Sequence, residues 1–213
     1  MNSTEDIRER ASKGDADAQC QLGILYMKGD GISKDVSEAL KLFKLSAEQG
    51  HSNAQYCLGL MYYDGEDVPK DHKEAFKQFR LAADKGHKDA QYFVGRMYDL
   101  GEGVKRSFAD MLIWYQTAAD NGSMDAQYAC GVIYEKGRNV LKDHNESVRY
   151  YRMAAEQGYA DAQFRLGKMC ERDTGNRSAE SGKDAERWYE LAAKQGHEDA
   201  KKALDKLRAK KQR

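Results

Sequence analysis

The sequence predicts an all-α protein in which helix pairs stack into a solenoid, and three observations support this fold class. The motif Gly-x-x-x-Ala-Gln recurs, opening at Gly14, Gly50, Gly86, Gly122 and Gly158, with a decayed sixth copy at Gly196. Four steps are 36 residues and the last is 38, a period typical of stacked repeats. Apolar side chains follow helical spacing within each copy, and the only proline, Pro69, lies in an expected loop, so that it interrupts no helix.

The first copy, residues 14–49, shows how one repeat begins. Its first helix carries four apolar side chains at i, i+4, i+7 and i+8, a spacing that places them on one helical face. They are Ala18, Leu22, Leu25 and Tyr26. Gly29 and Gly31 then break the chain and end this helix.

The second helix of this copy is expected between Asp35, whose side chain suits an N-cap, and Gly50. Its apolar face is set out by Ala39, Phe43, Ser46 and Ala47. Each repeat is therefore a first helix, a loop and a second helix.

The same positions recur downstream and predict the core. On the first helix the rows are Leu22, Leu58, Val94, Cys130 and Leu166, and Tyr26, Tyr62, Tyr98 and Tyr134. On the second helix the row is Phe43, Phe79, Tyr115, Tyr151 and Tyr189. A glycine also recurs inside the first helix, at Gly23, Gly59, Gly95, Gly131 and Gly167. Because a mid-helix glycine costs about 1 kcal/mol relative to alanine, this row predicts a close approach of the partner helix.

We expect a cap at each end of the array. Residues 1–13 are interpreted as a lone second-type helix, because Ile7 and Ala11 occupy the positions of Phe43 and Ala47. The five repeats are assigned to residues 14–49, 50–85, 86–121, 122–157 and 158–195. Residues 196–213 are assigned to a basic capping helix with a narrow apolar stripe. Its lysines and arginines leave an alternative open, a segment that binds nucleic acid or acidic lipid.

Composition favours neither a membrane protein nor a protein that is basic throughout. Lysine plus arginine and aspartate plus glutamate number 35 each. No apolar run approaches the roughly 18 residues that span a bilayer, and the first ten residues are too charged for a secretory signal peptide. We therefore expect a cytoplasmic protein with no membrane partner, and a nucleic-acid partner is not favoured.

The second copy resembles the Sel-like repeat (SLR), a relative of the tetratricopeptide repeat. The resemblance is carried by residues 54–65, which include Leu58, Gly59 and Tyr62, and then by Ala75, Phe79, Ala82, Ala83 and Gly86. It covers about residues 14 to 200, in five copies. It implies a right-handed α/α superhelix of antiparallel helix pairs that acts as a scaffold or adaptor for a partner protein or peptide.

One branch of this family is cysteine-rich, with a disulfide in each repeat, and is described as penicillin-binding with weak β-lactamase activity. It supplies the alternative function, a β-lactamase-like hydrolase. The four cysteines here, Cys20, Cys57, Cys130 and Cys170, fall at four different repeat positions. Because a disulfide repeated in every copy needs two fixed positions, we expect free thiols and disfavour the hydrolase.

The sequence predicts no catalytic residue, no metal ligand and no cofactor site, and it identifies no small-molecule substrate. The histidines are His51, His87 and His197, which follow opening glycines, and His72 and His144, which follow the aspartate that opens a second helix. None has a nearby partner in the sequence suited to acid–base or metal chemistry. Motifs of a nucleophile elbow, a zinc protease or a phosphate loop are also missing.

A partner is expected on the inner, concave wall, which the first helices would form. At about 100° per residue, repeat positions 17, 20, 24 and 27 lie opposite the buried positions 18, 22, 25 and 26. We call the surface made by positions 20, 24 and 27 the first-helix face. Its candidate partner-binding residues are Ile24, Met27, Tyr56, Leu60, Tyr63, Tyr92, Arg96, Asp99, Tyr128, Glu135, Lys168 and Glu171.

This face is apolar toward the N-terminus and charged toward the C-terminus. Exposed apolar and aromatic side chains are common anchors of protein interfaces, so we expect a partner anchored by Tyr56, Leu60, Tyr63 and Tyr92. Alternatively, the aromatic row at position 20 stacks between successive first helices. The polar stretch at residues 172–184, which carries the two extra residues of the last repeat, is expected to be a loop with at most a lesser partner site.

Overall fold

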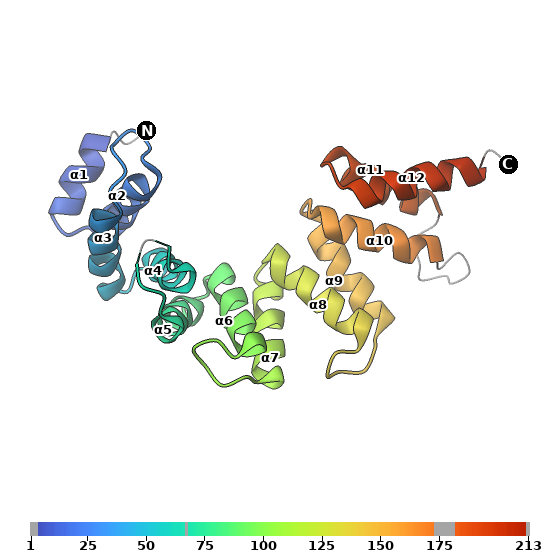
Figure 1. Ribbon diagram of the computed structural model, residues 1–213, viewed down its shortest axis with the longest axis horizontal. Helices are drawn as coiled ribbons and strands as arrows, with labels where there is room; N and C mark the ends of the chain where they lie inside the picture. The colour runs from blue at the N-terminus through green and yellow to red at the C-terminus, as the bar shows by residue number, and fades with distance from the viewer. Residues whose placement is uncertain (1–3, 67, 173–181, 212–213) are drawn as a thin grey trace. The chain divides into compact units, whose positions relative to one another are not determined.

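The computed structural model describes residues 4–66, 68–172 and 182–211 (Figure 1). Throughout this described part the regular structure is α-helical, in twelve helices, which confirms the expected fold class. The chain divides into two compact units, Met1–Trp114 and Tyr115–Arg213, and the division falls inside the seventh helix. Most of the loop expected at residues 172–184 lies outside the described residues.

The helices follow the repeat. The N-terminal unit contains α1 (Thr4–Ser12), α2 (Ala16–Lys28), α3 (Val36–Glu48), α4 (Ser52–Asp64), α5 (His72–Ala83), α6 (Lys88–Leu100) and the first part of α7 (Phe108–Asp120). The C-terminal unit contains the rest of α7, α8 (Met124–Lys136), α9 (His144–Glu156), α10 (Ala160–Arg172), α11 (Gly182–Lys194) and α12 (Glu198–Lys211). Even-numbered helices from α2 to α10 are first helices, and the odd-numbered helices from α3 to α11 are second helices.

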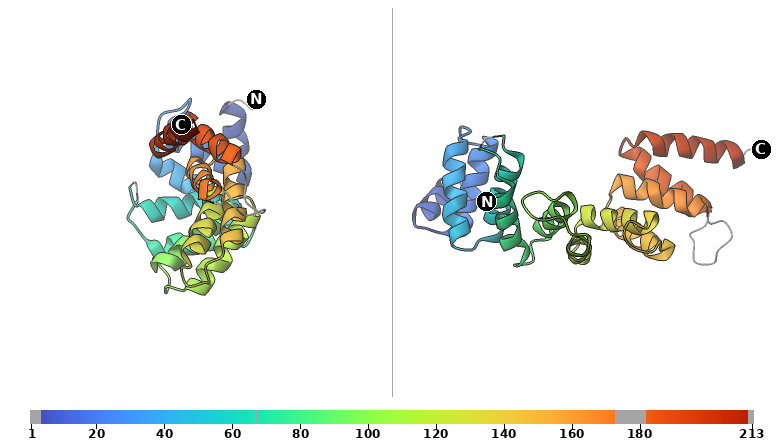
Figure 2. Two further views of the ribbon diagram at one scale, coloured as in Figure 1. Left: turned by 90° about the vertical axis from the view of Figure 1, so that its right-hand side faces the viewer. Right: turned by 60° about the horizontal axis from the view of Figure 1, so that its bottom comes forward.

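Within each unit, helices that follow one another in the chain pack side by side. In the N-terminal unit α2 packs on α3 and α4 on α5, and α3 in turn packs on α4. The C-terminal unit repeats this with α8 on α9, α9 on α10 and α10 on α11. Figure 2 shows the blue helices of the N-terminal unit and the orange helices of the C-terminal unit from two further sides.

The recurring glycine of the first helix makes room for the aromatic ring of the second. A β-carbon at Gly59 would lie 2.5 Å from the ring of Phe79, and one at Gly167 would lie 2.7 Å from the ring of Tyr189. Both rings are fully buried. These contacts confirm the predicted close approach and place the second-helix aromatic row in the core.

Side-chain caps fix where the helices begin. Asp35 accepts a hydrogen bond from the backbone N–H of Glu38, as expected for an N-cap. Three histidines do the same for α4, α6 and α12: the Nδ1 atoms of His51, His87 and His197 accept the N–H three residues onward at 3.2–3.3 Å. These three rings therefore have a structural role.

The glutamine of the repeat motif links each repeat to the helix before it. Gln19, Gln55, Gln91, Gln127 and Gln163 are each 5% exposed or less. In every case Nε2 donates to the backbone carbonyl of the alanine eight residues earlier, at 3.0–3.3 Å. The same carbonyl accepts the backbone N–H three residues onward at 2.8–3.0 Å, so the glutamine adds a second hydrogen bond at the C-terminal end of the preceding helix.

In three repeats the same side chain also accepts a hydrogen bond. Nε2 of a second glutamine donates to its Oε1 in the pairs Gln49–Gln19 (2.8 Å), Gln157–Gln127 (2.7 Å) and Gln195–Gln163 (2.9 Å). We call this amide pair the glutamine rung. It ties the end of a second helix to the first helix of its own repeat.

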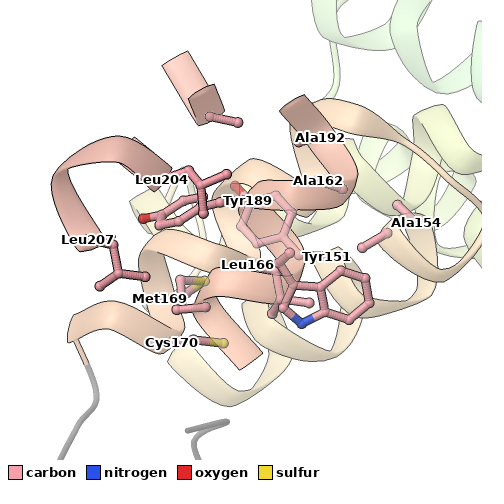
Figure 3. Close-up of a cluster of buried hydrophobic side chains, with 14 residues drawn as sticks. Tyr151, Ala154, Ala162, Leu166, Met169, Cys170, Tyr189, Ala192, Leu204 and Leu207 are labelled. Carbon is pink, nitrogen blue, oxygen red and sulfur yellow. The ribbon is translucent and has the colours of Figure 1, made fainter. Parts of the chain in front are cut away.

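Each unit has its own hydrophobic core. In the C-terminal unit, Tyr151, Leu166, Met169, Tyr189 and Leu204 belong to one buried cluster (Figure 3). The N-terminal unit is built around clusters that contain the rings of Phe43 and Phe79.

The tyrosine row at position 26 corrects one expectation. Tyr26, Tyr62, Tyr98 and Tyr134 are only half-buried. The preceding position faces the core more directly, as Met97 and Ile133 show. A tyrosine at the edge of the core keeps its hydroxyl within reach of polar groups, and that of Tyr134 accepts a hydrogen bond from Gln116 at 2.9 Å.

Candidate partner-binding face

Three of the candidate residues come together in the N-terminal unit. Ile24 and Met27 of α2 and Leu60 of α4 line one pocket of about 330 Å³. We call it the apolar pocket. Its other lining residues are Lys28, Phe43, Cys57, Met61, Asp64 and Glu66. Six of the nine lining side chains are therefore apolar, and the three charged ones come from the C-terminal ends of α2 and α4 and the loop after α4.

The repeat architecture produces this pocket. α2 and α4 are the first helices of successive repeats, and Phe43 of α3 contributes to the lining beneath them. That ring is held against the α2 backbone, since a β-carbon at Gly23 would lie 2.7 Å from it. The pocket therefore has a rigid aromatic side and is within the size range of ligand-binding pockets.

Cys57 gives the apolar pocket a thiol. Its thiol is hydrogen-bonded to that of Cys20, and this bond lowers the pKa of Cys57, assisted by the charge of Lys28 and opposed by burial. The same hydrogen bond, together with burial, raises the pKa of Cys20. Cys57 is therefore the member of the pair that ionises first, and thiolates are the nucleophilic form of cysteine.

Two position-20 tyrosines of the face, Tyr56 and Tyr128, contact the next repeat. Tyr56 stacks on His87 with ring centroids 4.4 Å apart, and Tyr128 packs on Tyr159 at 5.1 Å. Tyr92 packs on Phe93 of its own helix. The rings are half-buried. The contact of Tyr56 is stacked, whereas that of Tyr128 is tilted by 31°. Their partner rings, His87 and Tyr159, come just before the next first helices and are not members of the position-20 row. The role of the position-20 tyrosines in partner binding remains a prediction.

In the N-terminal unit Tyr63 and Arg96 belong to one intramolecular network, and Asp99 forms a separate ion pair. The Tyr63 hydroxyl donates to Glu102 at 2.6 Å, and the Arg96 guanidinium lies 5.4 Å from the Tyr63 ring centre. Burial, together with the bond to Glu102, raises the pKa of Tyr63 to about 12. Asp99 lies 3.9 Å from Arg106. This network orders the side chains before any partner arrives.

Glu135 is similarly engaged in the C-terminal unit. It accepts a hydrogen bond from the Tyr151 hydroxyl at 2.7 Å and lies 3.7 Å from Arg165. The corresponding glutamate of the next repeat, Glu171, accepts from Tyr189 at 3.1 Å. Position 27 therefore ties the first helix to the buried aromatic row in both repeats.

Lys168 and Glu171 line a second pocket, of about 370 Å³, in the C-terminal unit. We call it the lysine pocket. Its remaining lining residues are Phe164, Tyr189, Asp199, Lys202, Ala203, Lys206 and Lys210. With four lysines and two carboxylates the lining is net positive, although Lys210 pairs with Glu171 at 3.0 Å and Lys202 with Asp199 at 3.7 Å.

Sequence reasoning missed several lining residues of the apolar pocket. A helical wheel of the first helix could not include Phe43, which belongs to the second helix, or Glu66, which follows α4. Cys57 is at repeat position 21, one residue after a position of the first-helix face. The only sequence feature that could have drawn attention to it is that the cysteines of the other repeats occupy different repeat positions. The wheel also placed position 20 on the free side, whereas Cys20 is buried, because helices of neighbouring repeats cover it.

Two further observations bear on function. Among the described residues, no group of three or more histidine, cysteine or acidic side chains is arranged to hold a metal ion. No helix in the same part of the chain has both the length and the apolar character needed to cross a membrane.

The helix pairs repeat along the chain, and hydrogen bonds from the motif glutamine join each repeat to the helix before it. This arrangement defines a helical-repeat solenoid protein. The Sel1 repeat family model matches residues 16–51, 52–87, 88–123, 125–159 and 160–197. The chain therefore belongs to the Sel1 repeat family, which confirms the resemblance seen in the sequence. Solenoids of this family are generally protein-interaction scaffolds and are mostly non-enzymatic.

Solved structures support this assignment. The chain is similar to c5321, a protective antigen with an SLR fold from uropathogenic Escherichia coli, with a TM-score of 0.85 and 34% identity over 96% of this chain and 44% of that one. It thus spans less than half of that protein. A Sel1 repeat protein from Oxalobacter formigenes gives 0.78 and 34%, over 90% and 75%.

The immunity protein Pa5087 from Pseudomonas aeruginosa shares the fold, with a TM-score of 0.59 and 23% identity over 90% of this chain and 72% of that one. The search of curated proteins returned no match.

Proposed function

We propose that this chain is a non-enzymatic scaffold that binds a partner protein or peptide on the first-helix face, with an apolar side chain of the partner in the apolar pocket. The observation that carries the proposal is the convergence of Ile24, Met27 and Leu60 on one pocket of about 330 Å³. Burying apolar area contributes about 25 cal/mol per Å², and interface affinity is typically concentrated in a few such anchors.

The charged side chains of the pocket suggest how the partner is oriented. Lys28, Asp64 and Glu66 lie among the apolar lining residues. A partner with a bulky apolar residue followed by a basic residue would place its charge near the two carboxylates. Complementary charges of this kind mainly set register and association rate.

The candidate residues of the C-terminal unit have a different proposed role. Lys168, Glu171 and the other lysines of the lysine pocket would attract an acidic stretch of the partner and add little to affinity, because exposed ion pairs contribute about 0–1 kcal/mol. We also propose that the five repeats and the two terminal caps have the residue boundaries assigned from the sequence.

Comparative capture tests the proposal. The full chain, the double variant Ile24→Asp/Leu60→Asp and the control Leu100→Asp are immobilised separately and exposed to extract of the producing organism, and bound proteins are quantified by mass spectrometry. Leu100 is 53% exposed on α6 and lies outside the pocket lining, so it controls for a new surface charge. Circular dichroism verifies that all three are folded.

A partner of the apolar pocket is a protein that the wild type and Leu100→Asp retain and the double variant loses. Its binding is then measured with purified components. If every captured protein binds all three baits equally, the proposed pocket interaction is wrong.

Two rival functions have simple tests. The four cysteines are free thiols in this structure, unlike the disulfide-linked hydrolase branch, and hydrolysis of nitrocefin above background would favour that branch. Nucleic-acid binding by α12 would weaken steeply with salt and disappear on deleting residues 201–213. It is disfavoured because Arg208 pairs with Glu186 at 2.9 Å and Lys210 with Glu171 at 3.0 Å.

A further inference from the structure

A second groove in the N-terminal unit contains two amide oxygens that lack a hydrogen-bond partner. The groove, of about 480 Å³, is lined by residues of α3, α4 and α5 and by Gly50. Gln55 and Gln78 both line it, and the Oε1 atom of each is buried without a partner among the described residues. Gln55 is 3% exposed. A buried polar atom left unpaired costs about 1–3 kcal/mol, so such atoms require an explanation.

The orientation of both amides is fixed by their nitrogen atoms. Nε2 of Gln55 donates to the Ala47 carbonyl at 3.3 Å, and Nε2 of Gln78 donates to the Glu74 carboxylate at 2.7 Å. Turning either amide over would place its oxygen against another oxygen. Both unpaired atoms are therefore hydrogen-bond acceptors.

The corresponding groove of the C-terminal unit differs from this one in the hydrogen bonding of its motif glutamine. It has about the same volume, 450 Å³, and is lined by Gln163, Trp188 and Gln195 at the positions of Gln55, Gln78 and Lys85. There the glutamine rung is complete, because Gln195 donates to Gln163 at 2.9 Å. In the N-terminal groove, Lys85 replaces the rung glutamine and donates to the Gly50 carbonyl instead.

The two departures from the repeat pattern therefore converge on one place. Gln78 occupies a position that holds Leu42, Trp114, Tyr150 or Trp188 in the other repeats, and Lys85 occupies one that holds glutamine or asparagine. The first change adds an acceptor to the groove, and the second removes the donor that the neighbouring acceptor would use. The result is a groove whose lining includes two residues with unpaired acceptor atoms.

We propose that this groove binds the side-chain carboxamide of a glutamine or asparagine residue of a partner polypeptide. Its NH₂ group donates one hydrogen to Gln55 and the other to Gln78, in the way that Gln195 donates to Gln163. Its carbonyl oxygen accepts from Lys44 or Lys77, and its methylene stem packs on Leu58 and Leu81; all four residues line the groove.

The charges of the lining favour a neutral group over a cation. Lys44 and Lys77 balance Glu48 and Glu74, so the lining has no net charge. A guanidinium or ammonium group would satisfy the acceptors but would lie among Lys44, Lys77 and Lys85, against only two carboxylates, Glu48 and Glu74. The site is separate from the apolar pocket, with which it shares no lining residue.

Small amides provide a direct test. The ¹⁵N-labelled full chain is titrated with butyramide and with pentan-2-one, which replaces the NH₂ group by a methyl group of similar size, while NMR follows the Gln55 side-chain amide and the Gly50 backbone amide. We expect saturable shifts with butyramide and at least about tenfold weaker binding of the ketone. Equal binding of the two compounds, or no shift with butyramide, would overturn the proposal.

Further titrations separate the alternatives. Propylguanidinium or butylammonium binding more tightly than butyramide would contradict a carboxamide site. Capped glutamine is expected to bind more tightly than free glutamine, whereas the reverse order would indicate a metabolite site and contradict the polypeptide partner.

Repeat-guided variants supply the matched controls. Lys85→Gln restores the glutamine rung, and Gln78→Trp restores the side chain of the C-terminal groove. We expect each to abolish the butyramide shifts while circular dichroism and thermal unfolding confirm an intact fold. In the same spectra, the amides of Gly158 and Gln163 in the C-terminal groove report on an already satisfied site and should not shift. Wild-type binding by a folded Lys85→Gln/Gln78→Trp double variant would also contradict the proposal.

Discussion

The apolar pocket and the lysine pocket share repeat positions 24 and 27 and the aromatic position of the second helix, and they differ in chemistry. Position 24 is Ile24 and Leu60 in the first pocket and Lys168 in the second, and position 27 is Met27 in one and Glu171 in the other. In both units a buried aromatic ring, Phe43 or Tyr189, lies beneath these side chains. The repeat therefore fixes where the pockets form, and the variable positions decide what each can bind.

This difference suggests a division of labour. An apolar pocket contributes affinity through desolvation, whereas a lysine-lined one attracts acidic groups and depends on ionic strength. Four predictions test the comparison, and the first concerns the glycine that packs against the aromatic ring of each pocket.

The largest expected effect comes from the glycine beneath each pocket. Gly23→Val and Gly167→Val would each drive a side chain into a ring, since even a β-carbon would lie 2.7 Å from Phe43 or Tyr189. We expect a loss of unfolding free energy of about 1–3 kcal/mol or more in each case, measured by urea denaturation. The double variant Gly23→Val/Phe43→Leu should recover part of the loss, and unchanged stability of Gly23→Val would show that the ring contact is unimportant.

The second prediction compares how much each pocket contributes to the free energy of binding, once a partner has been identified. Leu60→Asp is expected to weaken binding by about 2 kcal/mol, or roughly 30-fold in Kd, at both low and high salt. Lys168→Ala should cost less than about 1 kcal/mol and only at low salt. Isothermal titration at two salt concentrations measures both, and a salt-dependent loss in Leu60→Asp would contradict the assignment.

The third effect concerns the thiols. Cys57 lines the apolar pocket and its pKa is lowered, whereas burial raises the pKa of Cys130 to about 12. A disulfide reagent at neutral pH should therefore modify Cys57 at least about tenfold faster than Cys130. Cys20→Ala removes the hydrogen bond and should slow the reaction, and Cys130→Ala should leave its rate unchanged. Mass spectrometry identifies the site, and preferential labelling of Cys130 would contradict this order.

The smallest effect is a pH dependence that His87 contributes in the N-terminal unit. Tyr56 stacks on His87 there, whereas the equivalent Tyr128 packs on Tyr159. Burial lowers the pKa of His87 below its usual 6.5. As the pH falls, the unfolded chain binds the proton first, so stability is complete above 6.5 and is lost as the pH approaches the lower folded value.

His87→Asn keeps a good N-cap without an ionisable ring. We expect its melting temperature to fall less than that of the wild type between about pH 7.5 and about pH 5.5. Identical pH profiles would show that His87 does not contribute to acid sensitivity.

Much of the fold could be predicted from the sequence because the same pattern of apolar residues and glycines recurs in every repeat. Five copies of one pattern placed Phe79 and Tyr189 in the core and explained the glycines that face them. The candidate site was predicted less completely. Ile24 and Leu60 follow from a helical wheel, but Phe43 enters the apolar pocket from another helix. The proposed role of Gln78 could be inferred only after the structure placed it in the same groove as Gln55.

The hydrogen bond from the motif glutamine has a consequence for biosynthesis. Gln55 donates to the carbonyl of Ala47 at the end of α3, and Gln163 does the same for Ala155 at the end of α9. Each of these carbonyls also accepts a backbone N–H, from Gly50 at 2.8 Å and from Gly158 at 3.0 Å, so the glutamine supplies a second hydrogen bond. That second bond comes from a residue that the ribosome makes later. While the chain is being synthesised, the end of its newest second helix gains this bond only when the next Ala-Gln pair emerges and folds.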